Sequence, residues 1–365
     1  MRWRSRLLHA VQVEVTSRCS RRCSVCPRWA LADCWREGDI SEALWRRLIP
    51  DLALADHVHL QGWGEPLLHP KLPQMVRDAH AAGCRVGLTT NGDLLGEASS
   101  WMVEEAVDLV TVSVAGDVAS HPEMRDGSGL RRLWELINAL KATRGRRRRP
   151  RLQVSYLLTW KNAPHLPTVV KEAAASGADE LFVSHLDCTP SKRLLGLAAF
   201  SEGGLRSGMS GFLADAERTA REVGLAYRPP ALEPQSLLTC ALNPLRLVFV
   251  GWDGRVFPCV NLGLPVSGSI PRWHGPSEDR VAPLVYGDLA SQSLSDLLKA
   301  PTYRRFTAPL VERLAAEKRF LSGLGGAFGS EAIEQLDRAD RARDQALAAA
   351  TFPAECRGCH KQWGW

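Results

Sequence analysis

The pattern of apolar and polar positions predicts alternating strands and helices over the first two hundred residues of the chain. Six short segments are rich in β-branched and apolar residues, as strands are, at 11–16, 57–61, 85–90, 109–114, 152–158 and 180–185. Between and after them, apolar residues recur with the period of a helix, at 41–54, 72–82, 97–106, 130–143, 166–176 and 208–223. Six strand–helix units in series predict a parallel sheet with right-handed crossovers.

Six units fall short of the eight that close a full barrel of this kind. We therefore expect an α/β fold whose sheet forms an open, partial (β/α)6 barrel. In such sheets the chemistry lies at the carboxyl ends of the strands. The residues that directly follow each strand are therefore the first candidates for function.

The pattern changes after Tyr227. Three prolines between 229 and 234 indicate a linker, and 245–258 predicts a β-hairpin with a tight Asp-Gly turn. Residues 266–283 are rich in Gly, Pro and Ser and predict a surface loop. Further helical segments are expected at 293–298, 302–306 and 312–350.

This change of pattern predicts two domains. We expect the partial-barrel core at 1–227 and a small α+β domain at 228–365, with a helical insertion at about 311–350. The 365 residues are 45% hydrophobic and 24% charged, which is ordinary for a globular protein. No apolar run approaches the length of a membrane helix, and the N-terminus lacks the apolar segment of a signal peptide. We therefore expect a cytoplasmic protein that does not interact with membranes.

Much of the net charge of +6 is concentrated at 144–151, which reads RGRRRRPR. Such a run suits a solvated loop between a helix and a strand, or a contact with an acidic partner or phosphate. No aromatic residues are interleaved with it, so we expect no DNA partner.

Ten cysteines are present, and seven of them fall into two groups. In a reducing compartment, clustered thiols bind metal more often than they form disulfides. The first group is Cys19, Cys23 and Cys26, in a C-x3-C-x2-C loop after the first strand. Three thiolates cannot complete a tetrahedral zinc site without a distant fourth ligand, which is the alternative. They can hold three irons of a 4Fe-4S cluster and leave the fourth iron open to a ligand.

The segment 14–28, EVTSRCSRRCSVCPR, resembles the cluster loop of the radical S-adenosylmethionine (SAM) superfamily. The resemblance implies that SAM binds the open iron and is cleaved reductively to a 5′-deoxyadenosyl radical, which abstracts a substrate hydrogen. It also implies a SAM site built from residues after successive strands, namely Gly62, Gly64, Glu65, Thr90, Asn91, Ser113 and Arg125. Read without the resemblance, the glycines suit a plain turn and Arg125 suits the surface. The family pattern S-x-D-G is SVAG here, so the acid is missing or moved to Asp117.

The second group is Cys240, Cys259, Cys356 and Cys359. Four thiolates complete a closed metal site, either an iron–sulfur cluster or a structural zinc. The hairpin with Gly254 before Cys259 resembles the SPASM/twitch extension of radical SAM enzymes. The resemblance implies a second, auxiliary 4Fe-4S cluster. Further segments resemble a subgroup known as tungsten-cofactor oxidoreductase maturases, among them YGDLASQSLSDLLKAPTYRRF at 286–306.

The sixth predicted strand ends in Ser184-His185-Leu186-Asp187-Cys188, facing the expected cavity. Cys188 could donate a hydrogen atom to a substrate radical, and His185 or Asp187 could remove a proton; all three could also simply line the barrel mouth. The main hypothesis is a radical SAM oxidoreductase or maturase acting on a peptide or partner protein, with flavodoxin or ferredoxin as reductant. The alternatives are a small-molecule dehydrogenase or epimerase, and a non-catalytic metal-binding scaffold.

Overall fold

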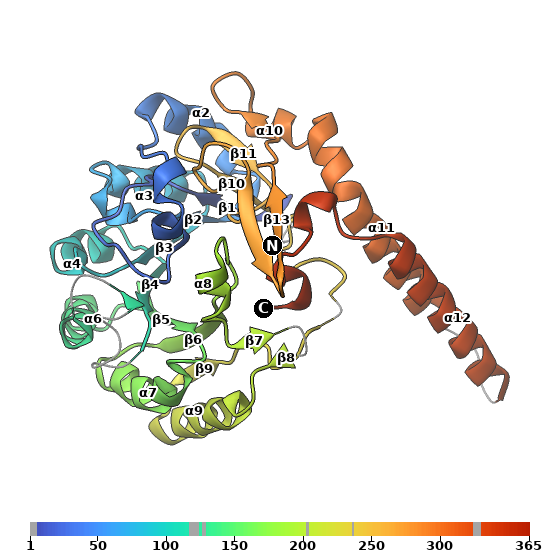
Figure 1. Ribbon diagram of the computed structural model, residues 1–365. Coiled ribbons are helices and arrows are strands. Elements are labelled where there is room, and N and C mark those ends of the chain that lie inside the picture. The colour runs from blue at the N-terminus through green and yellow to red at the C-terminus, as the bar shows by residue number, and fades with distance from the viewer. Residues whose placement is uncertain (1–5, 117–123, 126–128, 202–203, 236, 324–329) are drawn as a thin grey trace.

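The computed structural model describes residues 6–116, 124–125, 129–201, 204–235, 237–323 and 330–365. Its centre is a curved parallel sheet with helices on the outside (Figure 1). Six parallel strands form it in chain order: β1 (Leu8–Val13), β2 (Ala55–Leu60), β3 (Arg85–Thr90), β4 (Leu109–Val114), β5 (Arg151–Leu158) and β6 (Glu180–His185). The expected α/β partial barrel is therefore confirmed.

Six longer helices follow these strands: α2 (Glu42–Leu52), α3 (Leu72–Ala81), α4 (Leu95–Glu104), α6 (Leu130–Arg144), α7 (Leu166–Ala175) and α9 (Met209–Val223). They cover the convex side of the sheet. The sequence dictates their ends locally: the Ser41 hydroxyl accepts a hydrogen bond from the Leu44 amide and caps α2. Strand residues such as Val11, Val58, Val86 and Val110 are fully buried beneath the helices, as expected for a parallel sheet that is covered on its face.

The C-terminal third does not form a sheet of its own at the predicted hairpin. Instead β10 (Leu247–Val250) pairs in parallel with β1, and β11 (Arg255–Phe257) and β14 (Gly287–Asp288) continue the same sheet in antiparallel order. At the other edge, β9 (Ala226–Arg228) pairs with β6. One sheet of ten strands thus runs across the boundary that we proposed at residue 227.

One expectation for the C-terminal third was wrong. The segment 266–283 is not a plain loop, because β12 (Ile270–His274) and β13 (Ser277–Val281) form a hairpin there. The expected helical segment at 312–350 is formed by two helices, α11 (Pro301–Gly323) and α12 (Ser330–Ala349). They lie side by side and extend away from the barrel. Arg313 of α11 links the two helices by donating hydrogen bonds to the carbonyls of Leu347 and Ala350, at the C-terminal end of α12.

Short elements complete the fold: α1 (Pro27–Ala30), α8 (Lys192–Leu195), α10 (Leu294–Leu297), the pair β7 (Phe200–Ser201) and β8 (Gly204–Leu205), and 3-10 turns at Ala32–Cys34, Pro66–Leu68, Ala163–His165, Ala354–Cys356 and His360–Trp363. None of the described helices is both long enough and apolar enough to span a membrane.

The basic run at 144–151 is partly structural. Arg144 is buried, forms an ion pair with Asp179 and donates to the Pro150 carbonyl over 2.8 Å. Arg149 pairs with Asp108 and Arg151 with Glu180. These arginines hold the loop to the amino ends of the strands, the end of the sheet opposite the candidate site.

Candidate active site

The three cysteines of the first group follow β1, at the carboxyl ends of the parallel strands. Cys23 is 8% exposed, and Cys19 and Cys26 are half-buried. The loop turns tightly, with the Cys26 amide donating to the Cys23 carbonyl over 3.1 Å. Burial, with smaller contributions from the neighbouring thiols of Cys23 and Cys19, raises the pKa of Cys26 to about 11. Because a ligating thiol must lose its proton, bound iron would have to supply the compensating positive charge.

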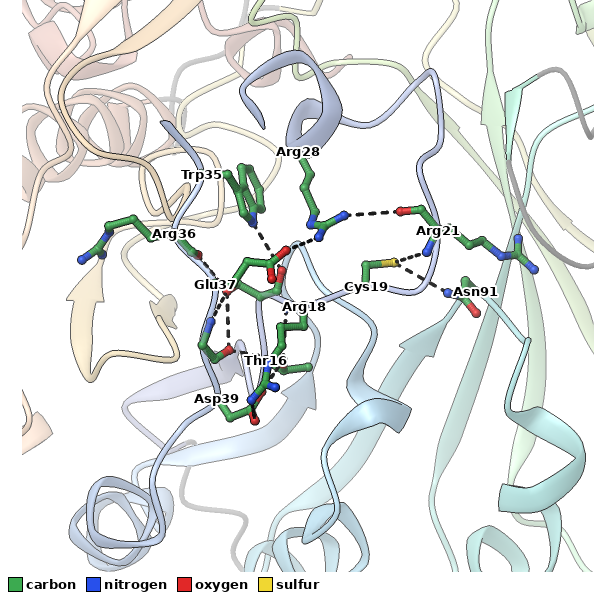
Figure 2. Close-up of polar contacts among 12 residues, drawn as sticks. Thr16, Arg18, Cys19, Arg21, Arg28, Trp35, Arg36, Glu37, Asp39 and Asn91 are labelled. Carbon is green, nitrogen blue, oxygen red and sulfur yellow. Dashed lines mark hydrogen bonds and ion pairs between the residues drawn. The ribbon is translucent and has the colours of Figure 1, made fainter. Parts of the chain in front are cut away.

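The loop is fixed at its base by the segment that follows it (Figure 2). The Thr16 hydroxyl donates to Asp39 over 2.6 Å, and Arg18 forms an ion pair with the same carboxylate. The Ser17 hydroxyl donates to the Arg36 carbonyl over 2.9 Å. These contacts join residues about twenty positions apart, and they fix the base of the loop that carries Cys19.

Farther along the loop, two arginines hold the backbone and were not identified from the sequence. Arg28 pairs with Glu37 and also donates to the Arg21 carbonyl over 3.4 Å. The Arg21 guanidinium is buried and pairs with Asp93, at 2.9 and 2.6 Å. These positions lack a distinctive spacing, so only the fold reveals that Asp93 lies against the loop.

The packing of the chain requires glycine at the two positions that we predicted to approach SAM. A Cβ on Gly64 would lie 2.2 Å from the Thr16 carbonyl oxygen and 2.5 Å from that of Arg18. A Cβ on Gly62 would lie 2.3 Å from Cγ of Glu14. The turn after β2 therefore packs directly on the cluster loop, and only glycine permits this approach.

Glu14 is a second feature that the sequence did not reveal. Its carboxyl group is fully buried and accepts a hydrogen bond from the Trp63 amide over 2.8 Å. Its Oε2 atom has no hydrogen-bond partner among the described residues. Burial raises the pKa of Glu14 to about 8. The protonated form is therefore favoured at neutral pH unless a cation binds nearby.

Glu65 links the turn after β2 to the end of β3. Its carboxylate accepts from the Thr90 hydroxyl over 2.7 Å and from the Asn91 amide over 2.6 Å. Burial nevertheless raises the pKa of Glu65 to about 7. The Asn91 side chain in turn donates to the Cys19 sulfur over 3.8 Å. Three of the residues predicted for SAM thus form one hydrogen-bonded chain that ends at the cluster loop.

Arg125 also lies beside the three thiols. Burial lowers the pKa of Arg125, whereas the thiols of Cys23, Cys26 and Cys19 raise it. Its Nε atom is buried and has no hydrogen-bond partner in the described part of the chain. A buried guanidinium with a free donor fits the carboxylate of a bound ligand. Ser113 stands half-buried near the end of β4, and Asp117 lies outside the described residues.

The second group of cysteines comes together from distant parts of the chain. Burial, with smaller contributions from other thiols of the group, raises the pKa of Cys240 to about 11 and that of Cys259 to about 12. The Cys359 amide donates to the Cys356 carbonyl over 3.0 Å, closing the C-terminal turn. These mutual effects place the four thiols within electrostatic reach of one another.

Two positively charged side chains lie beside this second group. Arg272 of β12 is buried and donates to the carbonyls of Glu355 and Arg357, at 3.0 and 2.9 Å, on both sides of Cys356. Lys361 follows Cys359 and forms an ion pair with Asp187. Positive charge beside a cluster stabilises its reduced, more negative state.

The donor atoms of both groups suit iron–sulfur clusters. Each group consists of thiols alone, three in the first and four in the second, and cysteine thiolates are the ligands that hold 4Fe-4S clusters.

The three candidate substrate residues after β6 have different surroundings. Cys188 is half-buried, and its pKa is raised well above the usual value by burial and by Asp187, with further contributions from Cys359 and Cys26. It therefore lies within electrostatic reach of both cysteine groups. A narrow cavity beside it is also lined by Asp187, Thr189, Arg272 and Cys359.

His185 is placed differently. Its Nε2 donates to the Ala231 carbonyl over 2.8 Å, and its ring packs edge-on against Phe200 and Trp365. Burial lowers the pKa of His185 to about 4, so the ring is neutral. The structure thus brings Cys188 and Asp187 to the same cavity, with Asp187 held by Lys361, and places His185 in an aromatic cluster instead.

Comparisons with known proteins agree with this arrangement. The model of the radical SAM superfamily matches residues 13–151, which include the first cysteine group, the turn after β2 and Arg125. The chain contains a radical SAM domain. The model of the SPASM iron–sulfur cluster-binding domain matches residues 240–319, which include Cys240 and Cys259. The two domains imply SAM and two 4Fe-4S clusters as cofactors of this radical SAM enzyme.

One curated relative is the tungsten-containing aldehyde ferredoxin oxidoreductase cofactor-modifying protein of Pyrococcus furiosus. The two sequences are 24% identical over 303 residues, and the match covers 80% of this chain and 82% of that protein. The enzyme is 29% identical over 184 residues to the PqqA peptide cyclase of Xanthomonas campestris pv. campestris, covering 48% of this chain and 46% of that one.

Solved structures share the fold. Native anSMEcpe with bound AdoMet matches with a TM-score of 0.58 and 14% identity, covering 93% of this chain and 98% of that one. SuiB of Streptococcus suis bound to the precursor peptide SuiA matches with a TM-score of 0.56 and 12% identity, covering 81% of this chain and 66% of that one.

Proposed function

We propose that this enzyme is a maturase that modifies a peptide or a partner protein by radical chemistry. The observation that carries the proposal is the position of Cys188, which packs in one apolar cluster with Cys34, shortly after the first cysteine group, and lines a narrow cavity together with Cys359 of the second. A substrate beside Cys188 would therefore lie between the two clusters. The likeness to the tungsten-cofactor modifying protein over 80% of the chain supports a maturase.

Each cofactor has a proposed set of residues. Cys19, Cys23 and Cys26 hold the first cluster, and Cys240, Cys259, Cys356 and Cys359 hold the second. Bound at the first cluster, SAM supplies the 5′-deoxyadenosyl radical that abstracts the substrate hydrogen. Glu65 and the turn containing Gly62 and Gly64 receive the ammonium group of SAM, Arg125 its carboxylate, and Thr90, Asn91 and Ser113 line the remaining space.

The chain's own residues orient and protect this chemistry. The ion pair of Asp187 with Lys361 fixes the side of the cavity next to Cys188. Buried walls exclude water from a reactive intermediate. We propose a flavodoxin or ferredoxin as the source of electrons. The ten free cysteines support a reducing, cytoplasmic compartment.

A second candidate function is radical epimerisation, and the Cys188 thiol is the observation that favours it. Burial keeps this thiol protonated. A protonated thiol can return a hydrogen atom to a substrate radical, which leaves a sulfur radical that needs one electron and one proton to be restored. The second cluster, next to Cys188, could supply that electron.

One experiment separates a macromolecular substrate from a small one. Cells of the source organism are grown in deuterated medium, and the extract is divided into protein, peptide and small-molecule fractions. Each fraction is incubated with the reconstituted enzyme, reductant and unlabelled SAM, and deuterium in the recovered 5′-deoxyadenosine is measured. We expect transfer from the protein or peptide fraction. Transfer from the small-molecule fraction alone would contradict the maturase.

A further inference from the structure

A cavity of ≈ 880 Å³ lies beside the C-terminal segment, outside the narrow space next to Cys188. Its walls come from the C-terminal residues after Cys356, from the turn between β12 and β13, and from the region of α8 and β7. Figure 1 shows these segments close together around the C-terminus. The volume falls within the range of sites that bind ligands, about 300–1,000 Å³.

One wall of this cavity is a rigid aromatic stack. Phe200 and Trp365 are stacked with ring centroids 5.0 Å apart and an angle of 9° between their planes. His360 packs edge-on against Phe200 at 4.6 Å. Trp365 is only 3% exposed, whereas Trp363, also in the lining, is 39% exposed. Such a wall offers apolar contact area at little cost in conformational entropy.

The charge of the cavity is positive. Arg206 and Arg357 both line it, both are exposed, and neither forms an ion pair within the described residues. Arg206 is oriented by a hydrogen bond from Nε to the Ala198 carbonyl, 2.8 Å long. Nε2 of His274, also in the lining, lies 3.0 Å from Oδ2 of Asp279, and the described lining residues include no Asp or Glu.

The walls of the large cavity and of the narrow space meet at one contact. The Thr189 hydroxyl and Nε2 of His360 are 3.2 Å apart; Thr189 lines the space next to Cys188, and His360 lines the large cavity. A substrate held in the large cavity would therefore lie next to the wall behind which Cys188 stands. Binding energy from a remote part of such a substrate can then position the reacting part.

From this arrangement we infer that the cavity binds an acidic segment of a peptide or protein substrate, with carboxylates on Arg206 and Arg357 and apolar side chains on the aromatic wall. The inference rests on the proposed maturase function and names the substrate feature that the enzyme recognises. It concerns binding and does not depend on which bond is changed.

Synthetic capped peptides test the inference directly. Three short peptides of alternating leucine and a polar residue carry glutamate, glutamine or lysine at the polar positions. Binding to the reconstituted enzyme with SAM is measured by isothermal titration calorimetry. We expect the glutamate peptide to bind about tenfold more tightly than the glutamine peptide, since charge-assisted hydrogen bonds to carboxylates are the stronger ones. The lysine peptide should bind most weakly.

Variants assign the binding to the cavity. Arg206→Gln and Arg357→Gln should each remove most of the preference for glutamate, whereas Arg218→Gln, at an exposed arginine of α9 that pairs with Asp215, should keep it. Iron content shows whether each variant is loaded, and Arg206→Gln alone is decisive if Arg357→Gln loses its cluster. Equal affinity for all three peptides, absence of binding, or a preference unchanged in Arg206→Gln would overturn the inference.

The same samples separate this inference from the proposed function. Formation of 5′-deoxyadenosine without substrate is measured on each preparation, and deuterium transfer is measured as described above. If the protein fraction transfers deuterium but the peptides show no preference, only the acidic-segment site is lost. If transfer comes from small molecules alone, the maturase function is lost.

Discussion

The side-chain amide of Asn91 donates to the sulfur of Cys19 over 3.8 Å, across the gap between the end of β3 and the cluster loop. The backbone amide of Asn91 meanwhile donates to Glu65 over 2.6 Å. One residue thus joins a ligand of the proposed cluster to the carboxylate proposed to receive SAM. Hydrogen bonds to cluster sulfurs raise the reduction potential, because they stabilise the added negative charge.

Asn91→Ala should therefore lower the reduction potential of the first cluster and leave that of the second unchanged. Loss of such an outer partner typically lowers affinity or activity by about 10–100-fold, and we expect that range for reductive SAM cleavage. The backbone bond to Glu65 is retained in this variant. Potentials are measured by redox titration followed by electron paramagnetic resonance, with Asn138→Ala on the exposed face of α6 as control. An unchanged potential would show that the bond to sulfur has no electronic role.

Gly64 tests the contact between the turn after β2 and the cluster loop. An added methyl group would meet the Thr16 and Arg18 carbonyl oxygens at 2.2 and 2.5 Å, so Gly64→Ala should displace the loop. We expect iron to fall from about eight to about four atoms per chain, because only the second cluster can load. Gly211→Ala is the matched control, since its Cβ meets nothing within 4 Å. Full iron content in Gly64→Ala would contradict this role.

The raised pKa of Glu14 predicts that the free energy of unfolding depends on pH. Its pKa is raised by burial to about 8, so between about pH 4.5 and 8 the folded state binds more protons at this group than the unfolded state. The free energy of unfolding should then fall as pH rises through this window, by at most about 1.4 kcal/mol per pH unit. Glu14→Gln keeps the acceptor for the Trp63 amide but cannot ionise.

The measurement is denaturant unfolding of both proteins at several pH values under anaerobic conditions. The stability of Glu14→Gln relative to the wild type should increase from pH 5 to pH 8. A constant difference would mean that Glu14 keeps its ordinary pKa in the folded enzyme.

Arg272 should set the potential of the second cluster. Burial raises the pKa values of the Cys259, Cys356 and Cys188 thiols. The buried Arg272 cation acts in the opposite direction and lowers all three pKa values. Arg272→Gln should therefore lower the potential of the second cluster alone. Arg280→Gln, on the neighbouring strand β13 with its side chain 65% exposed, should leave both potentials unchanged. A shift of the same size in both variants would exclude a local effect.

The sequence predicted the fold because it depends on local patterns, namely β-branched runs and helical periods. The first cysteine group was proposed from its local spacing, and the second from a resemblance, since its members lie far apart in the chain. The hairpin after residue 245 was predicted from its Asp-Gly turn, but its pairing with β1 was not, because Ala10 and Leu247 face each other only through tertiary structure. The hairpin at β12 and β13 was missed because its Gly-Pro-Ser turn resembles a loop. Arg21, Glu14 and Arg272 have no distinctive neighbours in sequence. Their roles come from burial, which no spacing encodes.

A substitution at Cys188 distinguishes formation of the radical from the use of the radical on the substrate. Cys188 lines a cavity together with Cys359 but stands outside both proposed sets of cluster ligands. Cys188→Ala should therefore keep both clusters and the formation of 5′-deoxyadenosine. If epimerisation is the reaction, turnover should be lost, and wild-type product formed in deuterated water should carry deuterium at the inverted carbon. Cys34→Ala is the control, since that thiol packs in the same apolar cluster as Cys188. Full turnover in Cys188→Ala would remove the epimerase and leave the maturase without a thiol donor.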